Sequence, residues 1–302
     1  APPTGVLVEA ITNTNTSSTT ANQLLDADSD TKIQVEESSD EDKIRFDVAG
    51  TEKAVLESTG LTVNDGTIIT VDDNSDVLTL KQTNADDNGV KLAFVKDSAS
   101  PADADQIASI SFYGDDDAGN ANEFVSIKVV ADDVSNGSED GHLKFFTQGG
   151  GTLAERMRID SSGRVLIGLS TADTLYGGIV PALQVEGTDV NGSSIGMFRN
   201  SNDASGPILS LGKSRGTSLN SDTIVQSGDA TGMIAFTGAD GGERMRATAA
   251  IKSFSDGTPG DNDMPGRLSF WTTPDGAYDE VERMRIDSSG RVLIGADSGD
   301  AF

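Results

Sequence analysis

A sequence of fourteen residues that occurs twice constrains the fold of this chain most. Residues 155–168 read ERMRIDSSGRVLIG, residues 282–295 repeat them without a change, and a looser copy lies at residues 52–64. Met157 and Ile159 alternate with charged side chains, which is the period of a half-buried strand. Asp160 to Gly163 have the composition of a tight turn, and a second short apolar run follows. We therefore predict that each copy is a β-hairpin that closes a small β module.

The duplication extends beyond the hairpin. Residues 110–114 (ISFYG) correspond to 234–238 (IAFTG), and residues 141–146 (GHLKFF) correspond to 266–271 (GRLSFW). The match covers roughly sixty residues and indicates an internal repeat. Because the three hairpin copies are unevenly spaced, a string of modules with insertions is favoured over a solenoid of fixed rung length.

The remaining apolar residues come in short β-branched runs between Gly, Asn, Asp and Ser, which is typical of an all-β chain. We predict an elongated string of small β modules made of hairpins and short sheets. The expected divisions are a lead-in or attachment segment (1–30), a first module (31–106), a second (107–168), an inserted region (169–230) and a third (231–302). Further strands are expected at 67–71, 77–82, 90–95, 182–186, 194–199 and 208–211.

Composition excludes several functions. The 302 residues carry 49 acidic and 22 basic side chains, a net charge of −27, so binding to nucleic acid is not expected. There is no cysteine and one histidine, His142, which excludes disulfides, thiolate metal sites and multi-histidine metal sites. No apolar run reaches the about 18 residues that a membrane helix needs, so membrane insertion is not expected.

Acidic clusters suggest metal binding or catalysis, but their patterns are incomplete. Asp26, Asp28 and Asp30 have the spacing that opens a calcium loop, yet position six is Thr31 rather than the required glycine. Similar clusters occupy 72–76, 115–117 and 256–263. Solvated loops are the preferred interpretation, with Ca²⁺ as the alternative, and no cofactor is predicted. Glycoside cleavage needs two fixed carboxyl groups in a cleft usually lined by aromatic rings. Aromatic residues make up only 5% of the chain, so we predict no catalytic residues.

Trp271 and Tyr278 are the candidate glycan contacts. Trp271 is the single tryptophan, and it replaces Phe146 of the other copy. If Leu268 and Phe270 point inward, Trp271 points out, where its ring can stack on a sugar. The alternative is packing against a neighbouring module. The arginine pairs 156/158, 244/246 and 283/285 are expected to pair with Asp or Glu.

The hairpin sequence, preceded by strands such as GRLSFWTTPDGA, resembles the repeat units of tail or head fibre proteins of tailed bacteriophages, common in marine and cyanobacterial viruses. Residues 28–46, 211–216 and 256–268 resemble the same family. The resemblance implies a homotrimeric virion appendage, with the chains intertwined or side by side in a fibre shaft. One end would be fixed to other virion proteins, and a host surface glycan or protein would be the receptor.

A trimer would bury the apolar faces of the modules together around a common axis. The candidate core residues are Met157, Ile159, Val165, Ile167, Met284, Ile286, Val292 and Ile294. The alternative is a core formed within one chain. Two other functions stay open: a subunit of a bacterial or archaeal extracellular filament or adhesin, and a glycan-cleaving tailspike.

Overall fold

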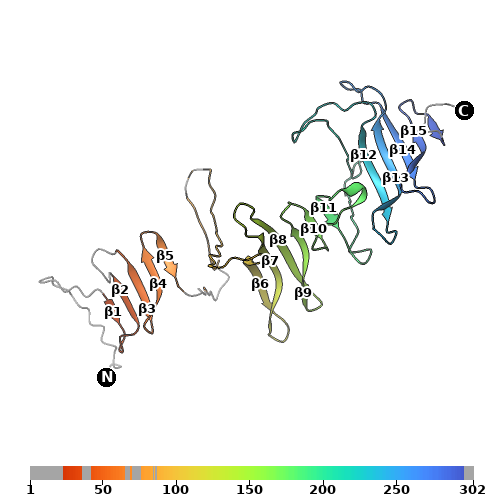
Figure 1. Cartoon of the computed structure of the whole chain (residues 1–302). Coiled ribbons are helices and arrows are strands. Elements are labelled where there is room, and N and C mark those ends of the chain that lie inside the picture. The colour runs from red at the N-terminus through yellow and green to blue at the C-terminus, as the bar shows by residue number, and fades with distance from the viewer. Residues whose placement is uncertain are drawn as a thin grey trace. The chain divides into compact units, whose positions relative to one another are not determined.

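The computed structural model describes residues 23–35, 42–64, 69, 76–83, 85 and 87–295. Within these ranges the regular elements are β-strands and one 3₁₀ turn, without an α-helix, so the all-β prediction is confirmed (Figure 1). The chain divides into two units, residues 1–92 and 93–302. The strands form three sheets, one in the first unit and two in the second.

The first unit contains a five-stranded antiparallel sheet in which every strand pairs with the next one along the chain. The looser copy of the repeated sequence coincides with its last two strands, so the hairpin predicted there is confirmed. The strands are β1 (Gln23–Leu25), β2 (Lys32–Val35), β3 (Ile44–Val48), β4 (Thr51–Glu57) and β5 (Gly60–Val63).

The second sheet has six strands in the order β11-β10-β9-β8-β7-β6. Its pairs are antiparallel except β10 with β11, which are parallel and joined by a crossover that contains the 3₁₀ turn η1 (Tyr176–Gly178). The strands are β6 (Gln106–Asp115), β7 (Ala121–Asp133), β8 (Asp140–Gly149), β9 (Thr152–Ile159), β10 (Val165–Ile167) and β11 (Leu183–Val185).

The third sheet repeats the plan of the second. Its five antiparallel strands lie in the order β12-β13-β14-β15-β16, and Met284 pairs with Ile294 as Met157 pairs with Ile167. The duplicated sequence therefore folds twice into the same meander with the same hairpin register. The strands are β12 (Ala230–Gly238), β13 (Arg246–Ser255), β14 (Gly266–Thr272), β15 (Val281–Ile286) and β16 (Val292–Ile294).

The turn of the repeated hairpin is fixed by its aspartate and glycine. Asp160 Oδ1 accepts hydrogen bonds from the backbone N–H groups of Ser162 and Arg164, both at 3.0 Å. Gly163 has φ of 77° and its counterpart Gly290 has φ of 78°, a region in which a Cβ is unfavourable. The Asp-Ser-Ser-Gly sequence is therefore required by the backbone of the turn.

Some expected strands do not form. Residues 182–186 contain β11, but residues 77–82, 90–95, 194–199 and 208–211 form no strand where the structure describes them. The expected strand at 67–71 lies, apart from residue 69, outside the described residues. Alternating apolar residues suit a strand, but a strand also needs a hydrogen-bonding neighbour, and no described strand pairs with these segments.

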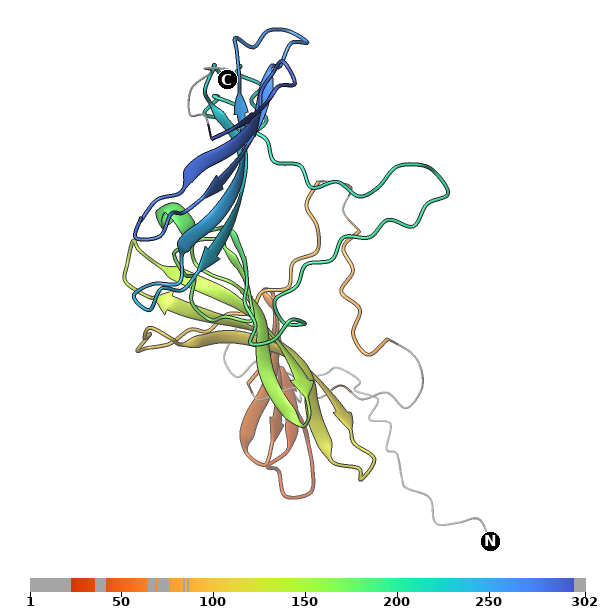
Figure 2. The ribbon, with the colours of Figure 1, turned by 90° about the vertical axis from the view of Figure 1, so that its right-hand side faces the viewer.

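Each sheet is a single layer. Within the second unit, the strands pack against their neighbours in the same ladder rather than face to face on the other sheet (Figure 2). Among the described residues, six apolar side chains are buried: Val55, Ala131, Leu166, Val225, Ala247 and Ala250. A domain normally buries its apolar faces between two layers. The described residues of a single chain form no such two-layered core.

Candidate assembly interface

The apolar face of the second sheet follows from its register. Because side chains directly opposite each other in a ladder share a face, one row of apolar residues crosses all six strands. A second row lies beside it. The first row is Ile110, Ile127, Phe145, Met157, Ile167 and Val185, and the second includes Val129, Leu143, Ile159, Val165 and Leu183.

The other two sheets have equivalent faces. In the third sheet the main row is Ile234, Ile251, Phe270, Met284 and Ile294, flanked by Leu268, Ile286 and Val292. In the first sheet it is Leu24, Ile33, Phe46, Ala54 and Val63.

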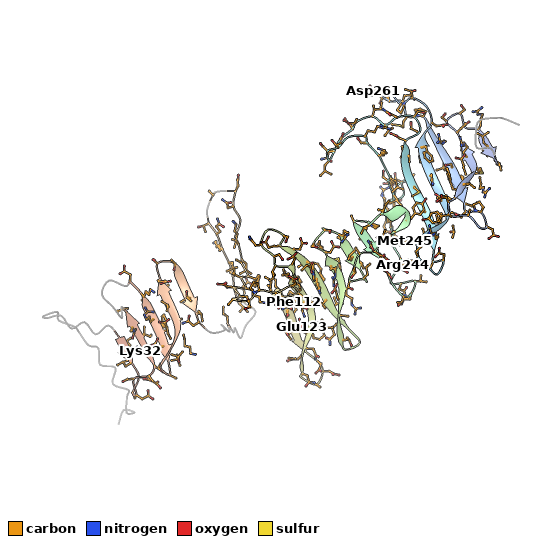
Figure 3. All side chains as sticks on the ribbon, in the orientation of Figure 1. Lys32, Phe112, Glu123, Arg244, Met245 and Asp261 are labelled. Carbon is orange, nitrogen blue, oxygen red and sulfur yellow. The ribbon has the colours of Figure 1, made fainter. Side chains whose placement is uncertain are left out.

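These faces are open to solvent in the single chain. Ile110 is 43% and Phe112 is 52% exposed on β6, and the matching Ile234 and Phe236 on β12 are 45% and 50% exposed (Phe112 is labelled in Figure 3). An extended apolar surface of this kind on a soluble protein marks an interaction site. We call the three faces together the apolar interface.

All eight sequence-predicted core residues lie on the apolar interface. Met157, Val165 and Met284 are half-buried by their neighbours in the sheet, and the other five remain exposed. No described element of the chain packs over them. Their burial between chains therefore stays a prediction.

The opposite face of each duplicated sheet is covered by its own side chains. The Lys128 ammonium lies 4.8 Å from the centre of the Phe146 ring, and Lys252 lies 4.2 Å from the centre of the Trp271 ring. Small residues lie opposite the rings: Ser126 pairs with Phe146 and is fully buried, and Ala250 pairs with Trp271. Long amphipathic side chains thus shield this face and keep their charges in water.

Ion pairs complete this charged face. Arg158 donates to both carboxylate oxygens of Glu155, at 2.5 and 2.9 Å, and Arg285 Nε pairs with Glu282 Oε1 in the third sheet. The predicted pairing with acids is thus confirmed for Arg158 and Arg285, whereas Arg156 and Arg283 donate to the hydroxyls of Thr147 and Thr272, both at 3.1 Å. Bidentate arginine–carboxylate pairs are the stronger class of ion pair. The two faces of each duplicated sheet therefore differ: the side chains of the sheet itself cover the charged face, and no described element covers the apolar face.

The candidate glycan contacts lie beside charged groups. The Trp271 indole N–H donates to Ser269 Oγ at 2.8 Å, and the ring is half-buried. Tyr278 is exposed, with the Arg246 guanidinium 3.5 Å from its ring centre. Each ring thus has a cation on one face. A sugar would have to stack on the other, and the glycan role stays a prediction.

The expected pairing of Arg244 and Arg246 with acids is confirmed, but sequence reasoning did not identify the partners or the polar joint that they form in the second unit. Arg244, labelled in Figure 3, pairs with Asp173 and Glu186, which flank β11 in the sequence. The Tyr176 hydroxyl donates to Glu280 Oε1 at 2.5 Å, and Lys252 reaches the same oxygen at 2.6 Å. The hydrogen bond to Glu280, with burial, raises the pKa of Tyr176 to about 12. These partners are far apart in the sequence, and no local sequence pattern predicts that they interact.

A cavity of about 240 Å³ adjoins this joint. It is lined by Tyr176, Glu243, Arg246, Tyr278 and Glu280, among other residues. Three of its charged groups are already paired: Arg246 with Glu243, and Glu280 with Lys252, which lies outside the lining. The cavity therefore fits a structural joint.

The acidic clusters have mixed surroundings. The carboxylate oxygens of Asp26, Asp28 and Asp30 lie within 4.8 Å of one another and are exposed. Asp116 accepts hydrogen bonds from Ala118 and Asn120 in its turn, and Asp256 pairs with Arg267. The cluster at 72–76 lies, apart from Asp76, outside the described residues. Asp116 and Asp256 thus have structural partners of their own.

The aspartate of the repeated hairpin makes a pH-dependent contribution to the stability of the folded chain. The hydrogen bond from the Arg291 backbone N–H holds the pKa of Asp287 below its usual 3.8. Burial opposes this effect, and the Arg291 guanidinium and the Ser289 N–H add to it. Because the folded pKa is depressed, this contribution is present above pH 3.8 and is lost as pH falls through the folded value.

We therefore expect Asp287→Asn to lower the melting temperature at pH 7 and to converge with the unmodified protein as pH falls well below 3.8. Thermal melts across a pH series measure this. Asp160→Asn, in the identical hairpin, is the matched variant and should behave alike. A difference between variant and unmodified protein that stays constant with pH would contradict the assignment.

No helix among the described residues has the length and apolar character needed to cross a membrane.

Comparisons with known proteins give a fold but no sequence family. No family model matches the chain, and no curated protein matches its sequence. The carboxy-terminal domain of the L-shaped tail fibre of bacteriophage T5 is similar in structure, with a TM-score of 0.60 and 13% identity, over 74% of this chain and 93% of that one. The same domain with its intra-molecular chaperone domain gives a TM-score of 0.60 and 14% identity over 74% of this chain, which spans 64% of that longer chain. The chain thus has a fold like that of a phage tail fibre domain.

Proposed function

We propose that this chain is a structural subunit of a virion fibre, that three copies form the fibre, and that the fibre serves host attachment. The observation that carries the proposal is the apolar interface. In the described part of the chain, all three sheets leave one apolar face uncovered, while the duplicated sheets cover the other face with their own side chains. A subunit that completes its core only by association has this design.

The energetics favour association. Fully burying one Val, Leu, Ile, Phe or Met side chain contributes about 1.5–3 kcal/mol. The side chains here are already partly covered, so each would contribute less, but every copy supplies several rows of them. Three single-layer sheets around one axis would close the apolar faces inward and direct the Lys, Arg and Glu side chains outward. The number three is supported by the resemblance of the hairpin sequence to phage fibre repeats.

The remaining parts of the proposal are the location and the partners. The fibre would be an appendage of the virus particle, attached to other virion proteins at one end, and it would bind a host surface glycan or protein. The repeat sequence favours a marine or cyanobacterial host. No catalytic role is part of the proposal.

The solution mass tests the assembly. One chain has a mass of 31.3 kDa. Sedimentation or light scattering at micromolar concentration is expected to give three times that mass. A stable, folded monomer would overturn the proposal.

Adsorption tests the biological role. The fluorescently labelled assembly is expected to bind cells of one or a few marine or cyanobacterial strains and to compete with the phage that carries it. Trp271→Ala and Tyr278→Ala report whether these rings contact the receptor. Binding to no strain that the phage infects would argue against host attachment and leave the structural role standing.

A further inference from the structure

Two segments have the sequence of strands but form none. The first arm comprises residues 77–95, and the second arm comprises residues 194–212. Figure 2 draws the second arm without an arrow. The backbone groups of residues 195–199 and 207–211, its two limbs, make no backbone–backbone hydrogen bond with other described residues.

The two arms are copies of each other. Each arm has alternate apolar residues before and after a tip that contains a glycine, and each of these residues in the first arm has an apolar counterpart at the same position in the second. Gly89 in the first arm corresponds to Gly206 in the second. All these apolar residues are exposed. The pairs are Leu78 with Ile195, Leu80 with Met197, Leu92 with Leu209, and Phe94 with Leu211.

In both arms, only one of the two alternating sets of side chains is apolar at every position. Between its apolar residues it carries Lys81 and Lys91, where the second arm has Phe198 and Ile208. Alternation of apolar and charged residues is the pattern of a strand with one buried side. In the single chain that side is not buried.

The arms precede the two duplicated sheets. The first arm lies before β6 and the second before β12 in the sequence. Each arm is therefore part of the repeated module, although it joins no ladder of that module. A duplicated strand pattern without a ladder indicates that its ladder partner is not among the residues that the structure describes.

The second arm is continuous with the apolar interface. Leu211 lies so close to Gly232 that a Cβ built on this glycine would be 2.8 Å from the Leu211 Cβ. Gly232 pairs with Ser253, whose other neighbour is Leu268 on the apolar face. The end of the arm thus reaches the surface through which, by our proposal, copies associate.

We infer that the arms are strands formed between subunits. In the assembly, the arm of one copy pairs through its backbone with a neighbouring copy of the same chain, and its alternate apolar side chains enter the shared core. Strand addition of this kind satisfies the free backbone groups and buries the apolar side in a single step. The inference rests on the proposed self-assembly and specifies which segments cross between chains.

Hydrogen exchange followed by mass spectrometry tests the inference on the assembled protein. Peptides covering residues 195–211 are expected to exchange about 100-fold or more slowly than an unstructured chain of the same sequence. Arm amides that exchange at the unprotected rate, in a protein with the mass of three chains, would overturn the inference and leave the proposed function intact. The mass of a single chain would overturn both.

A matched pair of variants tests which side of the arm is buried in the assembly. Leu209→Asp places a charge on the apolar side and is expected to remove most of the protection of the arm. Ser210→Asp carries the same charge one residue away, on the other side, and is expected to keep it. Because both positions are exposed in the single chain, neither change should unfold β12–β16, whose own exchange serves as the internal reference. Equal effects of the two variants would overturn the inference.

Discussion

Replacing Ile110 by aspartate is expected to abolish assembly. Ile110 lies in the main row of the apolar face of the second sheet, opposite Ile127, and is 43% exposed in the single chain. In a trimer the change would place three carboxylates in one apolar core. The effective cost of burying an unpaired ion is several kcal/mol. Sedimentation should therefore show a single chain or aggregate in place of the assembly.

Ser109→Asp is the control for this change. Ser109 is the preceding residue of β6, lies on the opposite face and pairs with Lys128. The same charge in the same strand should leave the assembly intact, since an exposed carboxylate near a lysine is at worst neutral. Ile234→Asp in β12 should reproduce the defect in the third sheet. Loss of assembly in both Ile110→Asp and Ser109→Asp would contradict the assignment of the faces.

Leu166→Ala is expected to destabilise the protein far more than the same change at Leu293. The two leucines occupy the same position of the identical fourteen-residue sequence. Leu166 has 0% exposure, whereas Leu293 is half-buried. Truncating a buried leucine costs about 2–5 kcal/mol, because a cavity remains where the side chain was.

The difference arises from the crossover after β10. Gln184 on β11 exchanges two hydrogen bonds with Asp173, both at 3.0 Å, and so holds the crossover beside Leu166. Among the described residues, no strand pairs with β16 on its outer side. Leu293→Ala should therefore cost about 1 kcal/mol. Exchange protection of residues 140–168 and 266–295 measures the two effects separately, and equal losses would show that the crossover does not cover Leu166.

The fold of the repeated hairpin could be predicted from the sequence because its determinants are local. The strand period and the turn are indicated within a few residues by Met157, Asp160 and Gly163, and the structure confirms both the strand and the turn. The apolar face was predictable for the same reason: period-two alternation fixes which side chains share a face once the register is known.

Other features depend on groups distant in the sequence. The arms were predicted as strands from their alternation, but a strand is defined by its neighbour, and the alternation does not reveal whether that neighbour belongs to the same chain. The joint of Arg244, Tyr176 and Glu280 escaped prediction because three unremarkable polar residues meet only when β11 and the third sheet are in place. What covers the apolar interface is likewise not encoded locally.

The meander topology has a consequence for biosynthesis. Every ladder joins strands that follow one another in the sequence. Apart from the crossover between the parallel strands β10 and β11, closing each pair requires only a short loop. Low sequence separation between contacts makes folding fast. Each sheet is therefore expected to form soon after its residues leave the ribosome, in order from the amino-terminal end. Under the proposed assembly, the slow step is then the encounter of separate chains. Its rate depends on concentration, so the yield of the proposed fibre is expected to rise more steeply than in proportion to the amount of chain synthesised.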